Sequence, residues 1–87
     1  MNNFYGILKV IEKSDIKIDY YNKLKMFFSL VCLDEENNTK FCLICGEDLI
    51  DNMYSKINID SSIYVNGYVE NKKDDNVNID IDYILFA

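Results

Sequence analysis

The chain has 87 residues, a length that predicts a single domain over residues 1–87 with one hydrophobic core. Its hydrophobic content of 49% excludes a disordered protein, and Pro, Trp, His and Arg do not occur in it. Without histidine the commonest general base at neutral pH is missing, and without arginine a phosphate can be held only by lysines, aromatic rings and backbone groups.

The net charge of −6 is unevenly distributed along the chain. Between Lys9 and Lys25, five lysines and three acidic residues give +2, whereas four lysines and twelve acidic residues elsewhere give −8. One interpretation is that these charges solvate the outer faces of strands. The other is that the locally basic segment contacts phosphate groups.

The first predicted element is a strand over residues 4–11, which is apolar except for Gly6 and Lys9 and is expected to be mostly buried. Gly6 is a point where a barrel strand can bend. Residues 14–23 are polar with isolated apolar residues, and they predict a hairpin connection whose arms extend the flanking strands.

A long second strand is predicted over residues 24–33. Met26 and Phe28 lie on one of its faces and Phe27 on the other, so both faces are apolar, as in a strand that is covered on both sides. Phe27, Phe28 and Phe41 are all expected in the core.

Residues 34–39 predict a turn in which Asn37 and Asn38 suit positive-φ positions, and residues 40–45 predict a third strand. After Gly46 the apolar spacing changes to steps of one, three and four, which predicts an amphipathic helix of about three turns. Its apolar residues are Leu49, Ile50, Met53, Tyr54 and Ile57.

Two more strands follow the helix. In the fourth, over residues 61–69, Ile63, Val65, Gly67 and Val69 alternate with Tyr64, Asn66 and Tyr68. The fifth alternates most regularly, with these residues predicted to face inward: Val77, Ile79, Ile81, Tyr83 and Leu85. Five strands with one helix between the third and the fourth predict an all-β protein with the five-stranded barrel of the oligonucleotide-binding (OB) fold.

Three consecutive features carry a family resemblance: a strand ending at Gly46, the helix over residues 49–57, and the strand Ile63–Val69 with its internal Gly67. In this order they resemble the bacterial-type single-stranded DNA-binding protein family. The segment 77–86 also fits, so the resemblance is specific over about half of the chain. It implies an OB fold, a role in DNA replication and binding of single-stranded DNA by a homo-oligomer.

The chain departs from the family pattern in four places. The family has stacking aromatics at the start of the third strand and directly before its terminal glycine, where this chain has Thr39 or Lys40, and Cys45. A basic extension after the fourth strand is reduced to Lys72 and Lys73, and the family's acidic tail is absent from these 87 residues. The resemblance therefore implies a short, divergent member with low-affinity, sequence-tolerant binding.

Stacking on exposed aromatic rings near lysines is the sequence-tolerant way to hold single strands. The first hairpin, the outer face of the fourth strand and the loop after it supply such residues. The candidates for nucleic-acid binding are Lys17, Tyr20, Tyr21, Lys23, Lys25, Tyr64, Tyr68, Lys72 and Lys73. The alternative for each tyrosine is packing on the barrel surface or at a subunit contact.

Cys42 and Cys45 have the spacing of a metal or redox motif, but residues three apart on a strand point to opposite faces and do not converge on one ion. The three cysteines, Cys32 included, are therefore predicted to lie in the core, and no metal or cofactor is expected. Asp80 and Asp82 share a strand face without a nucleophile or base beside them, so no enzymatic activity is predicted.

Two functions remain open on the sequence. The first is a single-stranded DNA-binding homo-oligomer, located in the cytoplasm because neither a charged leader nor a membrane-spanning run is found. The second is an acidic interaction module of a mobile element, such as an anti-CRISPR inhibitor, that mimics nucleic acid through residues including Asp74, Asp75, Asp80 and Asp82.

Overall fold

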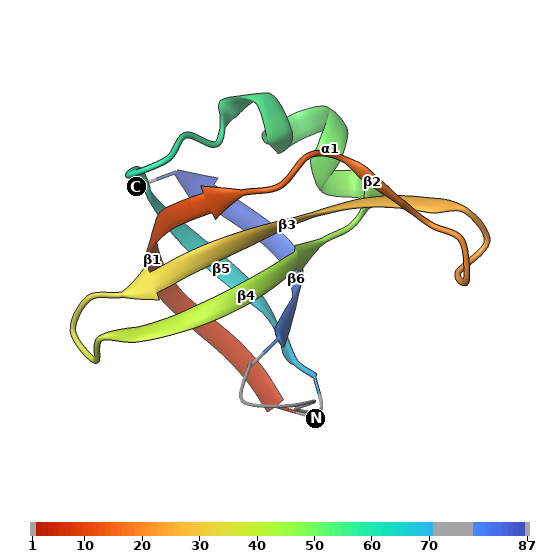
Figure 1. Ribbon diagram of the computed structural model, residues 1–87. Coiled ribbons are helices and arrows are strands. Elements are labelled where there is room, and N and C mark those ends of the chain that lie inside the picture. The colour runs from red at the N-terminus through yellow and green to blue at the C-terminus, as the bar shows by residue number, and fades with distance from the viewer. Residues whose placement is uncertain (1, 71–77, 87) are drawn as a thin grey trace.

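The computed structural model describes residues 2–70 and 78–86 (Figure 1). Its elements follow one another as β1 (Asn2–Lys13), β2 (Lys17–Asp19), β3 (Lys25–Asp34), β4 (Thr39–Cys45), α1 (Glu47–Met53), the 3₁₀ turn η1 (Tyr54–Lys56), β5 (Ser62–Val69) and β6 (Asn78–Phe86).

Five of these strands form a closed barrel. They are ordered β1-β5-β6-β4-β3, and pairing of β1 with β3 closes the ring. The β4–β6 pair is parallel and the other pairs are antiparallel. With one short helix between the third and fourth barrel strands, this confirms the predicted OB fold. The short β2 lies outside the ring, where it pairs only with β3.

The barrel interior is filled by aliphatic side chains, one phenylalanine and two cysteines, because alternate residues of each strand point inward. Its fully enclosed members include Val10, Phe28, Leu30, Cys32, Leu43, Cys45, Ile63, Val65 and Ile79. The turns of α1 and η1 lie over one end of the barrel, as the upper part of Figure 1 shows, and bury Leu49 and Ile57. The predicted single helix is thus an α-helix ending at Met53 followed by a 3₁₀ turn.

Lys13 holds this end closed. Its Nζ donates hydrogen bonds to the carbonyl oxygens of Tyr54 at 2.6 Å and Ile57 at 3.1 Å, and lies 4.0 Å from the centre of the Tyr54 ring. The Tyr54 hydroxyl donates to the Ser14 carbonyl at 2.8 Å, and its ring meets Phe28 edge-on at 4.9 Å. A charged donor therefore supplements the single backbone hydrogen bond to the Tyr54 carbonyl and supplies one to the Ile57 carbonyl at the end of the helical turns.

The prediction for the last strand is wrong beyond Ile81. Pairing with β5 shifts between Asn66 and Gly67, which face Tyr83 and Ile81, so Asp82 is an extra residue in β6. Such a bulge reverses the inward and outward positions that follow it. Ile84 is consequently buried, whereas the predicted inward residues Tyr83 and Leu85 are exposed. Val77 lies outside the described residues.

The bulge requires Gly67 opposite it. A Cβ at this position would overlap the carbonyl oxygen of Asp80 and lie 3.0 Å from the Ile81 Cα. The glycine identified in the sequence is therefore the point of close approach between two backbones.

The first strand is also less buried than predicted. Leu8 and Val10 lie in the core, but Tyr5 and Ile7 are exposed on the outer face of β1. An apolar run alone does not reveal which face is covered, and here only one is. In the turn before β4, Asn38 has the predicted positive φ, 51°, and Asn37 does not.

Among the described residues, no helix has the length and apolar character needed to cross a membrane.

Candidate nucleic-acid interface

The most prominent surface feature is the hairpin of β2 and the start of β3, which projects from the barrel (Figure 1) and is called the arm here, residues 16–27. Its register pairs Lys17 with Phe27 and Asp19 with Lys25. At its tip the Lys25 amide donates to the Asn22 carbonyl at 3.1 Å, which closes a tight turn. The arm thus carries the hairpin residues predicted from the sequence clear of the barrel.

The two tyrosines of the arm are free to stack. Tyr20 is 76% exposed and Tyr21 is fully exposed. The Tyr21 amide donates to the Asp19 carboxylate at 3.0 Å, which fixes the chain as it enters the turn. Because the two rings lie at the tip and are mostly in solvent, they can stack on bases without breaking contacts within the protein.

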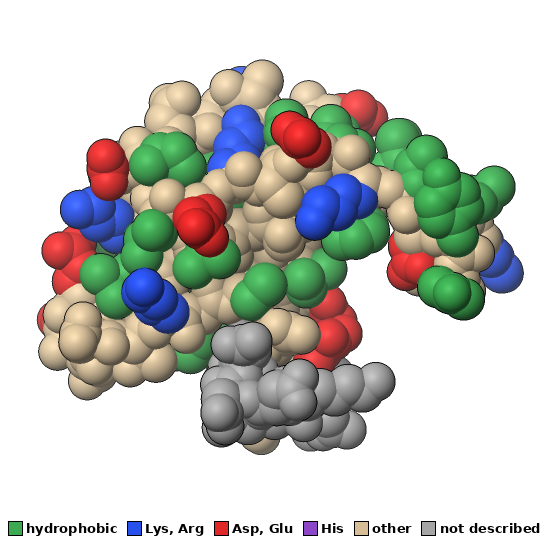
Figure 2. Space-filling view, viewed as in Figure 1, with side chains coloured by type: hydrophobic (Ala, Val, Ile, Leu, Met, Phe, Trp, Pro, Cys, Tyr) green, Lys and Arg blue, Asp and Glu red, His purple; other side chains and the backbone are tan. Residues whose placement is uncertain are grey.

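A recess of about 330 Å³ lies where the arm leaves the barrel. Figure 2 shows the arm standing away from the body with a hollow beside it. Residues of the arm, β4 and β6 line it: Asp19, Asn22, Lys25, Met26, Phe27, Ile44, Gly46, Asp80 and Ile81. Its wall combines an aromatic ring and one ammonium, that of Lys25, with two carboxylates, those of Asp19 and Asp80, so the lining carries a small net negative charge.

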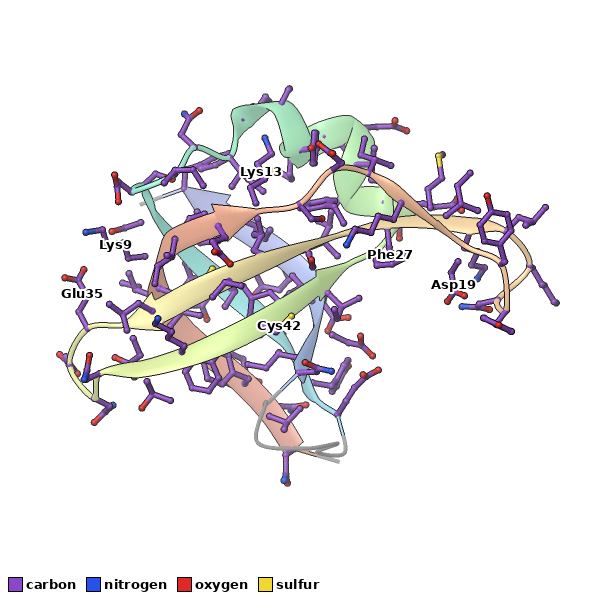
Figure 3. All side chains as sticks on the ribbon, in the orientation of Figure 1. Lys9, Lys13, Asp19, Phe27, Glu35 and Cys42 are labelled. Atoms are coloured by element: carbon purple, nitrogen blue, oxygen red, sulfur yellow. The ribbon has the colours of Figure 1, made fainter. Side chains whose placement is uncertain are left out.

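Phe27 is a recess residue that the sequence placed in the core. Phe27, labelled in Figure 3 where β3 enters the arm, is half-buried and lies on the same strand face as Lys25. Phe28 is fully buried and faces the barrel interior. The signal was present in the sequence, because adjacent residues of a strand cannot both point inward. Phe41, also predicted in the core, is half-buried and packs against Phe4 with ring centres 5.1 Å apart and ring planes tilted by 54°.

The outer face of β4 continues the recess. Cys42 is half-buried there, whereas Cys45 is enclosed in the core, so the two thiols point to opposite faces as predicted. Burial raises the pKa of Cys42, and the nearby Lys17 ammonium partly opposes this rise. The prediction that all three cysteines are core residues is therefore wrong for Cys42 alone. Burial raises the pKa of the Cys32 thiol to about 12, which keeps it protonated.

Cys45 also changes how the departure from the family pattern is interpreted. Its side chain is fully buried inside the barrel, so in this chain the position before Gly46 is not on the outer surface. The cysteine there does not remove a platform from the recess. Within residues 2–70 and 78–86, no three His, Cys, Asp or Glu side chains are grouped so that they could hold a metal ion.

The nine predicted residues divide into separate groups. Lys17, Tyr20, Tyr21, Lys23 and Lys25 all lie on the arm. Tyr64 and Tyr68 lie on β5, which pairs with β1 and β6 and not with β2 or β3, the strands of the arm. Tyr68 is the cross-strand partner of Asp80, which lines the recess, whereas Tyr64 lies four residues away from Tyr68 on β5. Lys72 and Lys73 lie outside the described residues.

The outer face of β1, β5 and β6 forms a second apolar surface, called the sheet face here. Cross-strand neighbours put Ile7, Tyr64 and Leu85 in one row and Tyr5, Asn66 and Tyr83 in the next. The rings of Tyr64 and Tyr83 lie 6.3 Å apart. Tyr64 thus sits among apolar neighbours without a lysine in either row.

Comparison with known proteins identifies the architecture through structure alone. No protein-family model and no curated protein sequence matches the chain. Among solved structures, the single-stranded DNA-binding (SSB) domain of a Synechococcus sp. protein has a TM-score of 0.82 at 8% identity, over 97% of this chain and 93% of that one. The protein PriB of Ralstonia solanacearum has a TM-score of 0.75 at 7% identity, over 99% and 97%.

A third similar structure is a replication protein A heterotrimer bound to single-stranded DNA. This chain matches it with a TM-score of 0.76 at 16% identity, over all of its own length and 22% of the other chain. The predicted resemblance to single-stranded DNA-binding proteins is thereby confirmed for the fold: the chain is an OB-fold barrel of the same architecture as these structures.

Proposed function

We propose that this protein is a non-catalytic binder of single-stranded DNA, with low affinity and little sequence preference. The observation that carries the proposal is the arm, which presents Tyr20 and Tyr21 to solvent beside Lys17 and Lys25. The similar structures support it, since their names describe an SSB domain and a complex with single-stranded DNA. The strand would stack on the tip of the arm and run along the recess over Phe27.

The charge of the site limits the affinity. Three lysines of the arm can neutralise phosphates, whereas Asp19 and Asp80 in the recess repel them. With about 0.7 counterions released per phosphate for single strands, three contacts predict a log–log salt slope of about −2. Binding is therefore expected mainly at low ionic strength.

Fluorescence anisotropy with a labelled oligo-dT 30-mer, titrated with the protein at several salt concentrations, tests this proposal. Tyr20→Ala/Tyr21→Ala is expected to weaken binding at least tenfold, since each stacked base contributes about 1–3 kcal/mol. Lys17→Gln/Lys25→Gln removes two of the three predicted phosphate contacts and should therefore reduce the salt slope by about two thirds.

The matched control is Tyr5→Ala/Tyr64→Ala, which removes two tyrosines from the sheet face, away from the recess. It is expected to leave binding within about twofold, the scatter of surface substitutions. Equal losses of DNA affinity in the two double-tyrosine variants would place the bound DNA on the sheet face. Absence of binding at micromolar protein, or binding insensitive to salt, would contradict the proposal and favour the acidic mimic of nucleic acid.

We also propose that the protein is a homo-oligomer that associates through the sheet face. Tyr5, Ile7 and Leu85 are each more than half exposed on it, and contiguous exposed apolar surface of this kind marks an interface. Sedimentation of Ile7→Lys/Leu85→Lys should give a monomer where the unsubstituted chain gives a larger species. An unchanged sedimentation coefficient would contradict this part of the proposal.

A further inference from the structure

The arm has two faces of opposite character. Lys17, Asp19 and Lys25 lie with Phe27 on the face toward the recess. On the other face, Ile18 and Met26 are direct cross-strand neighbours, and Ile16 and Leu24 follow just outside the paired residues of the same hairpin as exposed apolar side chains. This apolar arm face consists of Ile16, Ile18, Leu24 and Met26, which are 42%, 47%, 61% and 44% exposed.

This arrangement reverses the usual one, in which a strand turns its apolar side chains to the body and its charges to water. Here Asp19 is half-buried and Ile18 is exposed. Figure 2 shows the hydrophobic side chains gathered on the projecting arm. Four large apolar side chains that remain in solvent do not gain the favourable free energy that their burial would give, which indicates a surface that another molecule covers.

The turn of the arm gives a second indication. Leu24 has φ 56° and Lys23 has φ 54°, in the left-handed region that favours glycine or asparagine. A branched side chain at such a position destabilises the turn by about 1–2 kcal/mol. Most of the Leu24 side chain nevertheless lies in solvent, so it does not stabilise the fold of the isolated chain.

The neighbouring helix gives the charge of the surroundings. Glu47 of α1 accepts a hydrogen bond from the Met26 amide at 3.0 Å, which ties the start of the helix to the arm. Glu47, Asp48 and Asp51 are all exposed, and the last turn of α1 has no basic residue. The apolar arm face is therefore bordered by a negatively charged helix.

The apolar side chains of the arm and the negative charge of α1 together favour one kind of binding partner. Phosphates of nucleic acids and anionic lipid headgroups are repelled by the acidic helix, and a second copy would bring an identical acidic helix toward it. A protein segment with apolar anchors and flanking lysines or arginines satisfies both the apolar face and the charge. We propose that the apolar arm face and α1 form a docking surface for a basic amphipathic segment of a partner protein.

The proposal gives the arm two separate uses. Its recess face carries the residues assigned to DNA, and its apolar face is left for protein, so one hairpin would join the two. Met26 of the apolar arm face also lines the recess, whereas Ile16, Ile18 and Leu24 do not, so docking can be tested at those residues without changing the DNA path. The two activities are therefore separable by substitution.

The test uses the whole protein and a defined probe, a fluorescein-labelled helical peptide of about 18 residues with leucines on one face and lysines on the other. Two sibling peptides replace the leucines with serine or the lysines with glutamate. Anisotropy is expected to show binding of the Leu/Lys peptide alone. Amide shifts of the ¹⁵N-labelled protein should cluster on residues 16–26 and 47–53.

Substitutions then identify the surface. Ile16→Ser/Ile18→Ser is expected to weaken peptide binding about tenfold, as for apolar anchors, and to leave oligo-dT binding unchanged. Asp48→Asn/Asp51→Asn should weaken it about fivefold. The matched control Glu35→Gln/Glu36→Gln changes the charge equally in the exposed turn after β3 and should have less than a twofold effect.

Four outcomes would overturn the proposal. Equal losses in the two charge variants would show unspecific attraction to an acidic protein, and amide shifts centred on β1, β5 and β6 would place the peptide on the sheet face. Equal binding of the Leu/Glu peptide would remove the role of α1. A change in sedimentation of Ile16→Ser/Ile18→Ser would show that the occupant is a second copy.

Discussion

Lys13 and Lys17 are close in sequence, but the structure uses them in opposite ways. Lys13 is held at the closed end of the barrel by two carbonyl oxygens and an aromatic ring. Lys17 is exposed on the arm, where no side-chain hydrogen bond or ion pair of the described residues involves it. The comparison separates a region whose side chains stabilise the fold from one whose side chains are available to other molecules.

The same contrast applies to apolar residues. Phe28 and Leu30 of β3 are fully enclosed, and Met26 of the same strand is largely in solvent. Strand β3 thus crosses from the core into the arm along its length. Substitutions in the barrel should therefore change stability, and those in the arm should change binding.

The largest effect is expected at Gly67. In Gly67→Ala the new Cβ overlaps the backbone of β6 at Asp80, so the strands must separate, and a loss of at least about 3 kcal/mol in unfolding free energy is expected. Urea denaturation measures it. Gly46→Ala is the control: no atom lies within 4 Å of its Cβ and its φ is −82°, so stability should change by less than about 0.5 kcal/mol. Similar losses at both glycines would contradict the bulge geometry.

Lys13→Met tests the comparison directly. It removes two charged hydrogen bonds, and although the Tyr54 carbonyl still accepts from the Ile57 amide, the Ile57 carbonyl loses the bond from Lys13, so a loss of about 2 kcal/mol is expected. Lys17→Met should stay within about 0.5 kcal/mol. Thermal and urea unfolding of the two variants suffice, and a smaller loss for Lys13→Met than for Lys17→Met would reverse the assignment of the two regions.

The turn of the arm provides a smaller effect of opposite sign. Lys23→Asn/Leu24→Gly replaces two residues at positive φ with those that favour it, which should stabilise the hairpin by about 1 kcal/mol. Hydrogen exchange of the Lys25 amide, bonded to Asn22, is expected to slow about fivefold. Faster exchange would mean that the side chains themselves support the turn.

The smallest effect concerns pH. A hydrogen bond with Asp80, then burial and the charge of Asp80, raise the pKa of Glu70 to about 7. Because this carboxyl binds its proton more tightly in the folded state, it stabilises the fold less as pH rises from about 4.5 to about 7. Glu70→Gln should therefore raise the urea midpoint slightly at pH 8 and leave it nearly unchanged at pH 4. An equal change of the urea midpoint at pH 4 and pH 8 would exclude the Glu70–Asp80 pair as the cause of the pH dependence.

Much of the fold follows from local patterns in the sequence. The order of strands and helix along the chain, and the start of the helix after Gly46, come from apolar periodicity and glycine placement, whereas the close approach at Gly67 is seen only in the structure. The exposed half of β1 and the reversal after Asp82 do not follow from such patterns, because an apolar strand residue looks the same whether it meets the core or solvent. A bulge is specified by the register of two strands, which a single strand does not display.

The candidate site was predictable in part for the same reason. The arm lysines and tyrosines stand in one short segment, so their proximity is local. Phe27 was assigned to the core because its neighbours are apolar, and the recess that it lines is made by β4 and β6, distant in sequence. The separation of Tyr64 from the arm likewise depends on the closed ring of strands.

The parallel pairing of β4 with β6 also has a consequence for the order of folding. The β3–β4 hairpin is closed by a short turn in which Asp34 accepts hydrogen bonds from the amides of Glu36 and Asn37, so it can form early. Pairing of Cys42 with Asn78 must wait until the helix and β5 have formed and β6 has returned to the sheet. The barrel is therefore expected to close last along β4, and a chain delayed at this step would leave the edge of β4 open to other chains.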